Sequence, residues 1–229
     1  MPYSPGEVAE KTGFSIDTLR YYERIGLVAP AGRTAGGYRV YDEGSLARLA
    51  FIGATRTLTD PREESVAVID VGGGSTELAV GPPTGAMAWS ASFRIGSGFL
   101  ADSYLSSDPP SVEELEKVRR HVAGTFEGVE PPPAEAAVAV GGTATSLRRL
   151  LGAELSHETL ERGIRVLSQT PIEEVADRFE LDPERVRLLP AGILVLEALS
   201  DLLALPLRIA RGGLREGVLL ELHEERQAA

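Results

Sequence analysis

Residues 68–77 read VIDVGGGSTE. The apolar run before the glycines predicts a buried strand, and the three glycines predict a tight loop at its end. Glycine lets backbone N–H groups approach an anion without an intervening β-carbon, and the two hydroxyl residues that follow add donors. A glycine triplet alone is more often an ordinary turn, so its interpretation as a phosphate loop depends on the rest of the chain.

A second glycine loop, GGT at 141–143, lies between a predicted strand and a predicted helix. A helix N-terminus presents unpaired N–H groups and a partial positive charge, which favour an anion. Asp70, just before the first loop, is placed to orient a hydrated Mg²⁺. We expect phosphate to be bound by these residues: Gly72, Gly73, Gly74, Ser75, Thr76, Gly141, Gly142 and Thr143.

Strands and helices alternate through the larger part of the chain, which predicts a layered α/β or α+β domain. The expected strands are 66–71, 77–80, 88–95, 137–140 and 207–210. The expected helices are 112–126, 144–151, 158–167, 172–179, 191–205 and 215–225. A polar connector at 59–64 separates this domain, residues 65–225, from an N-terminal segment, residues 1–58.

The N-terminal segment has the pattern of a winged helix-turn-helix. Helices are expected at 5–12 and 16–25, and Ser15 can cap the second. A hairpin is expected at 31–41 with two glycines as its turn, followed by a helix at 44–57. Three motifs stand out in register: GEVAE at 6–10, TLRYYERIGL at 18–27 and GYRVY at 37–41.

Over about residues 3–52 these motifs resemble the MerR family of winged-helix regulators. In that family the second helix enters the major groove of DNA, and the wing holds the backbone. Members bind two half-sites as dimers through a long helix, which has no matching segment here. The resemblance, with the affinity of Arg and Tyr for phosphate oxygens, implies DNA contacts by Ser15, Thr18, Arg20, Tyr21, Arg24, Tyr38 and Arg39.

Five further pieces occur in order: DVGGGSTE at 70–77, Gly96 with SDPP at 107–110, VGGTATSL at 140–147, LPAGI at 189–193 and GLREG at 213–217. Over about residues 47–222 they resemble the second half of the Ppx/GppA phosphatases, the exopolyphosphatases and guanosine pentaphosphate phosphohydrolases. The resemblance implies one actin-like (ASKHA, ribonuclease H-like) α/β subdomain after a truncated winged helix-turn-helix. It also implies a catalytic acidic position at Glu77.

Two departures from that family count against catalysis. Its active site lies between two similar subdomains, and the first, with its Asp-x-Gly-Ser-x-Ser loop, has no counterpart here. The family's acidic pair, which supplies the base for water attack, is replaced by Ser45 and Leu46, and Glu43 lies one helical turn away. The stretch ARLAFI at 47–52 fits both families, so one helix joins the two parts.

Composition and charge exclude or disfavour several kinds of site and partner. The chain has 229 residues, no Cys and three His that are far apart in sequence, which excludes disulfides and disfavours a His-based metal site. Net charge is −11, but residues 1–58 are near +1 and residues 59–229 near −12, so any DNA contact must come from the N-terminal segment. No apolar run of about 18 residues occurs, and we expect a cytoplasmic protein that does not associate with membranes.

The leading hypothesis is a MerR-like transcriptional regulator whose phosphate-binding subdomain senses polyphosphate, a guanosine polyphosphate or a nucleotide. The alternative is a phosphoanhydride hydrolase, impaired or completed by a partner. A third is a nonfunctional remnant with exposed apolar surface. Double-stranded DNA and a phosphate-rich molecule are the expected partners, Mg²⁺ is the cofactor that the loops would take, and a homodimer is left open.

Overall fold

The computed structural model describes residues 4–6, 32–35, 39–40, 51, 54–55, 65–83 and 87–210. In the N-terminal segment two short strands, β1 (Gly32–Arg33) and β2 (Arg39–Val40), pair antiparallel. This pairing agrees with the expected hairpin at 31–41. The expected helices at 16–25 and 215–225 lie outside the described residues, as does most of the helix expected at 5–12.

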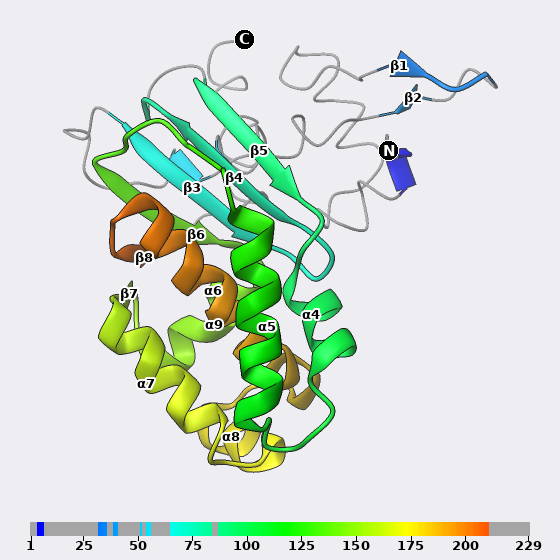
Figure 1. The fold of residues 1–229 in the computed structure, drawn as a ribbon, viewed down its shortest axis with the longest axis vertical. Helices are drawn as coiled ribbons and strands as arrows, with labels where there is room; N and C mark the ends of the chain where they lie inside the picture. The colour runs from blue at the N-terminus through cyan, green and yellow to red at the C-terminus, as the bar shows by residue number, and fades with distance from the viewer. Residues whose placement is uncertain are drawn as a thin grey trace, which may run out of the picture.

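A six-stranded mixed sheet is the centre of the larger part (Figure 1). Its strands are β3 (Val66–Val71), β4 (Thr76–Gly81), β5 (Trp89–Phe93), β6 (Ala136–Val140), β7 (Glu154–Leu155) and β8 (Leu207–Ile209). The order across the sheet is β5-β4-β3-β6-β8-β7. Strands β3 to β5 form an antiparallel meander, whereas β6 runs parallel to both β3 and β8. The carboxyl ends of β3 and β6 therefore meet at one end of the sheet.

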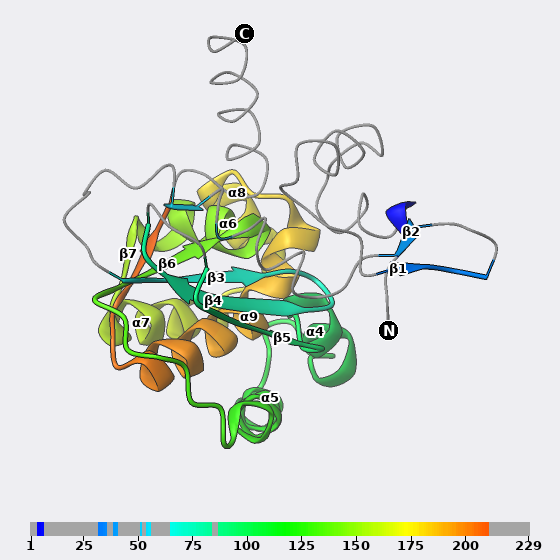
Figure 2. The same cartoon turned by 90° about the horizontal axis from the view of Figure 1, so that it is seen from above.

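The main core lies on one face of this sheet, and six helices of the described part of the chain contribute to it. They are α4 (Ser97–Tyr104), α5 (Val112–Phe126), α6 (Gly141–Leu151), α7 (His157–Leu167), α8 (Ile172–Phe179) and α9 (Pro183–Leu203). Figure 2 shows α4, α5, α7 and α9 on the same side of the strands. Their apolar residues pack with alternate residues of β3, β4 and β6 into the main core, which contains Ile69, Leu78 and Leu196. Helix α9 touches each of the other five helices and lies at the centre of this layer.

The opposite face of the sheet carries a smaller core. Phe51 and Ala54, both in helical conformation, are completely buried there against Val66, Val68, Ala79, Val138 and Val140. The Thr55 hydroxyl donates to the Phe51 carbonyl, as in a regular helical turn. The helix expected at 44–57 is thus confirmed at its described residues, and these residues pack against the sheet.

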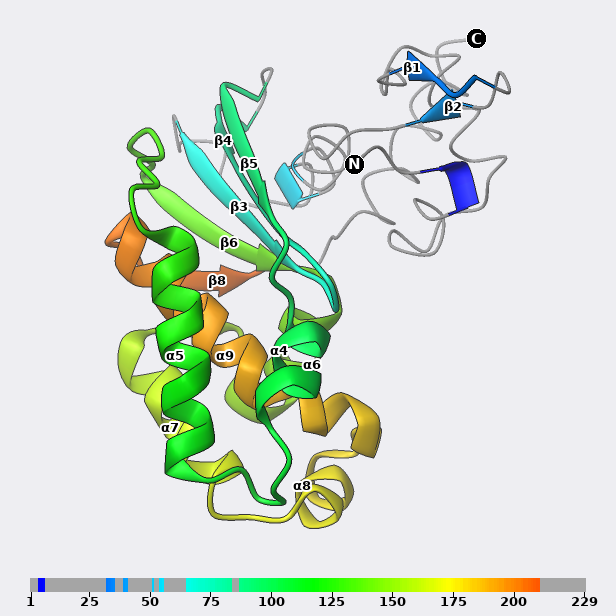
Figure 3. The ribbon, with the colours of Figure 1, turned by 45° about the vertical axis from the view of Figure 1, so that its right-hand side comes forward.

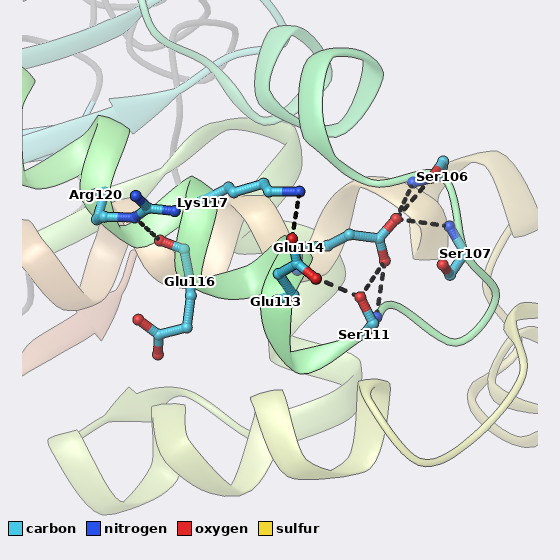
Figure 4. Close-up of polar contacts among 8 residues, drawn as sticks. All are labelled: Ser106, Ser107, Ser111, Glu113, Glu114, Glu116, Lys117 and Arg120. Carbon is cyan, nitrogen blue, oxygen red and sulfur yellow. Dashed lines mark hydrogen bonds and ion pairs between the residues drawn. The ribbon is translucent and has the colours of Figure 1, made fainter.

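Helix α5 begins as its sequence predicts. The Ser111 hydroxyl oxygen accepts a hydrogen bond from the Glu114 N–H, and the Glu114 carboxylate accepts one from the Ser111 N–H. This reciprocal pair is a capping box. The Glu114 carboxylate also accepts hydrogen bonds from Ser106 and Ser107, in the segment before the helix (Figure 4). One buried carboxylate therefore fixes the connection between α4 and α5.

Two predicted helices begin earlier than expected, and two elements of the structure had not been expected. Helix α9 begins at Pro183 rather than at residue 191, because the Asp182 carboxylate caps it and the internal Pro190 is tolerated. Helix α6 begins at Gly141 rather than at residue 144. Helix α4 and the short β7 had not been predicted. None of the helices in the described residues has the length and apolar character needed to cross a bilayer.

Candidate phosphate site

The two glycine loops lie at the same end of the sheet. The first, 72–75, joins β3 to β4, and the second follows β6. Because β3 and β6 are parallel neighbours, with Asp70 opposite Val140, both loops leave the sheet at the same level. Figure 3 shows the β3–β4 turn beside the arrowhead of β6, with α4 and α6 starting nearby. The predicted phosphate-binding residues are thus brought together.

The first loop is held from behind by the start of α4. Backbone N–H groups of Ser97 and Phe99 donate to the carbonyls of Gly72 and Gly73, at 2.9 and 2.8 Å. A β-carbon on Gly96 would stand 2.6 Å from the Gly72 carbonyl oxygen, so only glycine allows this close approach. On the outer side Gly73 is exposed, and a β-carbon there would meet no atom within 4 Å. One side of the loop is therefore held by hydrogen bonds to the start of α4, and the other side is open to solvent.

The second loop is the first turn of α6, where several N–H groups have no partner within the helix. Gly142 is exposed, and the Nη1 atom of Arg185 would lie 2.7 Å from a β-carbon placed on it. Arg185 comes from the first turn of α9 and forms none of the ion pairs identified among the described residues. A helix N-terminus and a guanidinium group thus converge on one exposed glycine, an arrangement that suits a phosphate oxygen.

Two carboxylates lie beside the first loop. Asp70 at the end of β3 pairs directly with Glu77 on β4, and both side chains are more than 90% buried. Burial, together with the negative charge of Glu77, raises the pKa of Asp70 to about 7. Glu77 accepts a hydrogen bond from Ser92 on β5. Two buried carboxylates held opposite each other create a negative site that a divalent cation would relieve.

Two of the predicted hydroxyl donors are already used within the protein. The Thr76 hydroxyl is fully buried and donates to the Ile95 carbonyl at 2.6 Å, so it holds the sheet to the segment before α4. The Thr143 hydroxyl donates to Ser97 Oγ at 3.3 Å, and Ser97 Oγ donates in turn to the Gly72 carbonyl at 3.3 Å. Ser97 therefore connects the two loops. Ser75 is buried, and Gly74 is exposed beside Gly73.

Sequence reasoning missed Arg185 and Ser97. Both lie far from the glycine motifs in the chain and reach them only through the packing of α9 and α4. The Asp182–Pro183 pair is a recognisable helix start that would have extended α9 to include Arg185.

The predicted DNA-contacting residues lie outside the described residues, except that Arg39 is placed in β2 by its backbone. The positions that replace the acidic pair, Ser45 and Leu46, also lie outside them, and so does Glu43. The interpretation of these residues stays a prediction.

Comparison with solved structures supports the architecture. A crystal structure of the Aquifex aeolicus member of the Ppx/GppA protein family is 26% identical, with a TM-score of 0.69 over 79% of this chain and 62% of that one. A structure of the type II variant of the Aquifex aeolicus Ppx/GppA phosphatase is 27% identical, with a TM-score of 0.68 over 77% and 62%. An exopolyphosphatase from Cytophaga hutchinsonii shares the fold at 19% identity and a TM-score of 0.68, over 79% of this chain and 63% of that one. The chain spans less than two thirds of these proteins.

Curated MerR-type regulators match the N-terminal segment. An HTH-type transcriptional regulator of Pseudomonas aeruginosa is 53% identical over 53 residues, which are 23% of this chain and 40% of that protein. The mercuric resistance operon regulatory protein of Bacillus cereus is 46% identical over 52 residues, 23% and 39% respectively. The chain thus spans less than half the length of these two regulators.

The family models divide the chain at one point. The MerR family regulatory protein model matches residues 4–41, and the Ppx/GppA phosphatase family model matches residues 42–226. The chain therefore belongs to the Ppx/GppA phosphatase family and carries a MerR family segment in front of its family domain.

Proposed function

We propose that the protein is a cytoplasmic DNA-binding regulator of MerR type whose Ppx/GppA subdomain binds a phosphate-rich ligand, polyphosphate or a guanosine polyphosphate, as a signal. The observation that carries the proposal is the meeting of the two glycine loops at one end of the sheet, with Gly73 and Gly142 exposed and Arg185 beside Gly142. Backbone N–H groups, a helix N-terminus and a guanidinium group are the donors that phosphate oxygens prefer.

Mg²⁺ fits the residues beside the first loop. Asp70 and Glu77 offer hard oxygen ligands, and burial together with the negative charge of Glu77 raises the pKa of Asp70 to about 7, a cost that a bound cation would lower. No group of three or more His, Cys, Asp or Glu gathers within the described residues, so Asp70 and Glu77 would supply two of the oxygen ligands, and phosphate oxygens and water would supply others. A bound Mg²⁺ would neutralise phosphate charge, while Asp70 and Glu77 would hold it through their carboxylates.

Isothermal titration calorimetry of the full chain with polyphosphate and with a guanosine polyphosphate, each with Mg²⁺, tests this proposal. Gly73→Val places a side chain in open space beside the first loop, where a ligand would lie, so binding heat should be lost. The matched control is Gly124→Val, since Gly124 is also exposed with no atom within 4 Å of a β-carbon, but lies on α5. Absence of heat in the folded parent, or equal heat in both variants, would contradict the proposal.

The second candidate is a phosphoanhydride hydrolase. Membership of the phosphatase family and the buried Asp70–Glu77 pair favour it. Phosphate release from polyphosphate or guanosine pentaphosphate distinguishes the two candidates, because the regulator needs only binding.

A further inference from the structure

The face of the sheet that carries Asp70 is the face covered by the Phe51 helix. Side chains alternate along a strand, so Val66, Val68 and Asp70 of β3 point to the same side. Their neighbours on β4 and β6 follow the same alternation, with Ala79 and Val138 opposite Val68. The acidic pair is therefore the next row of side chains after the apolar row on this face.

Phe51 and Ala54 pack on that apolar row. Their exposed fractions are 1% and 0%, and they form one buried cluster with Val68, Ala79 and Val138. One row lies two residues from the next along a strand, or about 6.6 Å. The cluster also includes Val140, which lies opposite Asp70 and directly precedes Gly141 of the second loop. The helix that contains Phe51 thus packs on residues that adjoin both the acidic pair and the second glycine loop.

The same helix is the first part of the family domain after the DNA-binding segment. The MerR match ends at residue 41 and the Ppx/GppA match begins at residue 42, and the last residue of β2, Val40, precedes Phe51 by few residues. Phe51, which packs on these residues of the sheet, is therefore close in the chain to the DNA-binding segment.

We infer that ligand binding at the glycine loops and DNA binding by the N-terminal segment are coupled through the packing of Phe51 and Ala54 on this face of the sheet. The inference rests on the proposed function and adds its mechanism of regulation. Close-packed interiors switch between discrete arrangements rather than deform smoothly, so a shift of β3 or β6 on ligand binding is passed to the helix packed on them. Coupling of this kind is reciprocal, because ligand and DNA change each other's affinity by the same factor.

The first measurement is the Kd for duplex DNA, by fluorescence anisotropy, with and without saturating polyphosphate or guanosine polyphosphate and Mg²⁺. We expect a change of at least about fivefold, the lower end of typical coupling between sites. Calorimetry of the ligand with and without DNA should give the same factor. Gly73→Val controls for direct competition between polyphosphate and DNA, since competition at the DNA-binding segment would persist in that variant while coupling would disappear.

Two variants test whether the coupling passes through the cluster that contains Phe51. Phe51→Leu reduces the volume of the side chain in the cluster, and Ile69→Val is its matched control in the main core on the opposite face. A flexible Gly-Ser insertion between Tyr41 and Asp42 leaves the cluster intact but loosens the connection, and it keeps the test valid if Phe51→Leu does not fold. We expect the coupling factor to fall toward one in Phe51→Leu and in the insertion variant, and to be retained in Ile69→Val.

The outcomes separate this inference from the proposed function. Ligand heat and DNA binding with a coupling factor of one in the parent would overturn the inference, but would leave the two binding activities of the proposed function standing. A factor that survives both Phe51→Leu and the insertion would also overturn it, because the coupling would then take another route. Absence of ligand heat in the folded parent would overturn the proposed function and the inference together.

Discussion

The Asp70 carboxylate lies directly against Gly141, and its Oδ1 atom is 2.1 Å from the position that a β-carbon on residue 141 would occupy. Gly141 also has a φ of +86°, in the region that favours glycine. Glycine is thus required at this position for two reasons, backbone conformation and the proximity of Asp70. The contact joins the end of β3 to the start of α6, and so fixes the acidic residue beside the second loop.

Replacement of Gly141 by alanine should therefore destabilise the protein and displace Asp70. The matched control is Gly152→Ala, because Gly152 has a φ of +91° but no atom within 4 Å of a β-carbon. Each substitution strains the backbone by about 1–3 kcal/mol, and only Gly141→Ala adds a steric conflict. Urea denaturation should show the larger loss for Gly141→Ala. Equal losses would show that Asp70 moves aside freely.

The stability of the protein should fall as pH rises through the range in which Asp70 ionises. The pKa of Asp70 is about 7 in the folded protein and 3.8 as a model value, so between these values the native state holds a proton that the unfolded state has lost. The contribution of Asp70 to the free energy of unfolding is thus full below about pH 4 and is lost progressively as pH rises from about 4 to about 7, by up to about 4 kcal/mol. Asp70→Asn should remove this dependence and be more stable than the parent at pH 8.

Mg²⁺ gives an independent check of the same carboxylate. A cation bound by ionised Asp70 should raise the melting temperature of the parent more at pH 8 than at pH 5, and Asp70→Asn should abolish most of the difference. Thermal unfolding with and without EDTA measures it. A parent whose stability is independent of pH between 4 and 8, after subtraction of the variant, would contradict the buried ionisable pair.

Glu114 should contribute strongly to stability, and its neighbour Glu113 should not. Burial alone would raise the pKa of Glu114, but hydrogen bonds from Ser106 and Ser111 outweigh it and hold the pKa well below its usual range. Glu114→Gln presents an amide N–H₂ to donors and should cost about 1–3 kcal/mol. Glu113 is exposed and pairs with Lys117 at 2.9 Å, so Glu113→Gln should leave stability nearly unchanged. Chemical denaturation of the two variants at pH 7 compares them directly, and similar losses would refute the role of Glu114.

We predict little or no phosphatase activity. In-line attack on a phosphoanhydride needs a positioned water, a base and stabilisation of the transferred charge. The glycine loops can supply part of the last requirement, but Leu46 cannot accept a proton, and a missing base costs about 10²–10⁴-fold in rate. Leu46→Glu alone should not restore turnover, because a base without a positioned water and full stabilisation of the transferred charge is not sufficient. Phosphate release from polyphosphate well above that of Glu77→Ala would instead favour the hydrolase.

DNA binding should be weak and strongly dependent on salt, because we expect a few arginines to contact phosphates and one chain to read one half-site. Arg20→Ala and Arg39→Ala should each weaken binding to all sequences and reduce the slope of log Kd against log salt by about one. Arg162→Ala, an exposed arginine on α7 in the acidic larger part, is the control. Anisotropy titrations between low and moderate salt give the slopes. If Arg20→Ala and Arg39→Ala both bind DNA as the parent does, the DNA-binding assignment is mistaken.

Local pattern predicted most of the described elements. The bounds of α5 and α8 were predicted residue for residue, because a capping serine or proline and a regular apolar spacing mark them. Helix α4 was missed since its sequence, SGFLADSY, has neither a capping side chain nor charged residues at its ends that mark a helix. Helix α9 was predicted from residue 191 only, and its first turns, from Pro183 to Pro190, were not recognised.

The glycine loops of the candidate site were predicted from the sequence, whereas Arg185 and Ser97 were not. A glycine loop can be recognised in a sequence, because a run of residues without side chains is itself a distinctive pattern. Arg185 and Ser97 become part of the site only through the packing of α9 and α4, and nothing in their own sequence neighbourhood marks them for a role in binding. The opposition of Asp70 to Glu77 depends on the register of β3 and β4, which sequence alone leaves open.

The parallel pairing of β3 with β6 also has a consequence for the order of folding. The β3–β4–β5 meander joins neighbouring segments, so it can form at little cost in chain entropy, whereas β6 must find β3 across α4 and α5. The first loop can therefore take shape early, but the contact of Asp70 with Gly141 must wait for the distant strand. We expect the capacity to bind phosphate to appear among the last properties acquired as the chain folds.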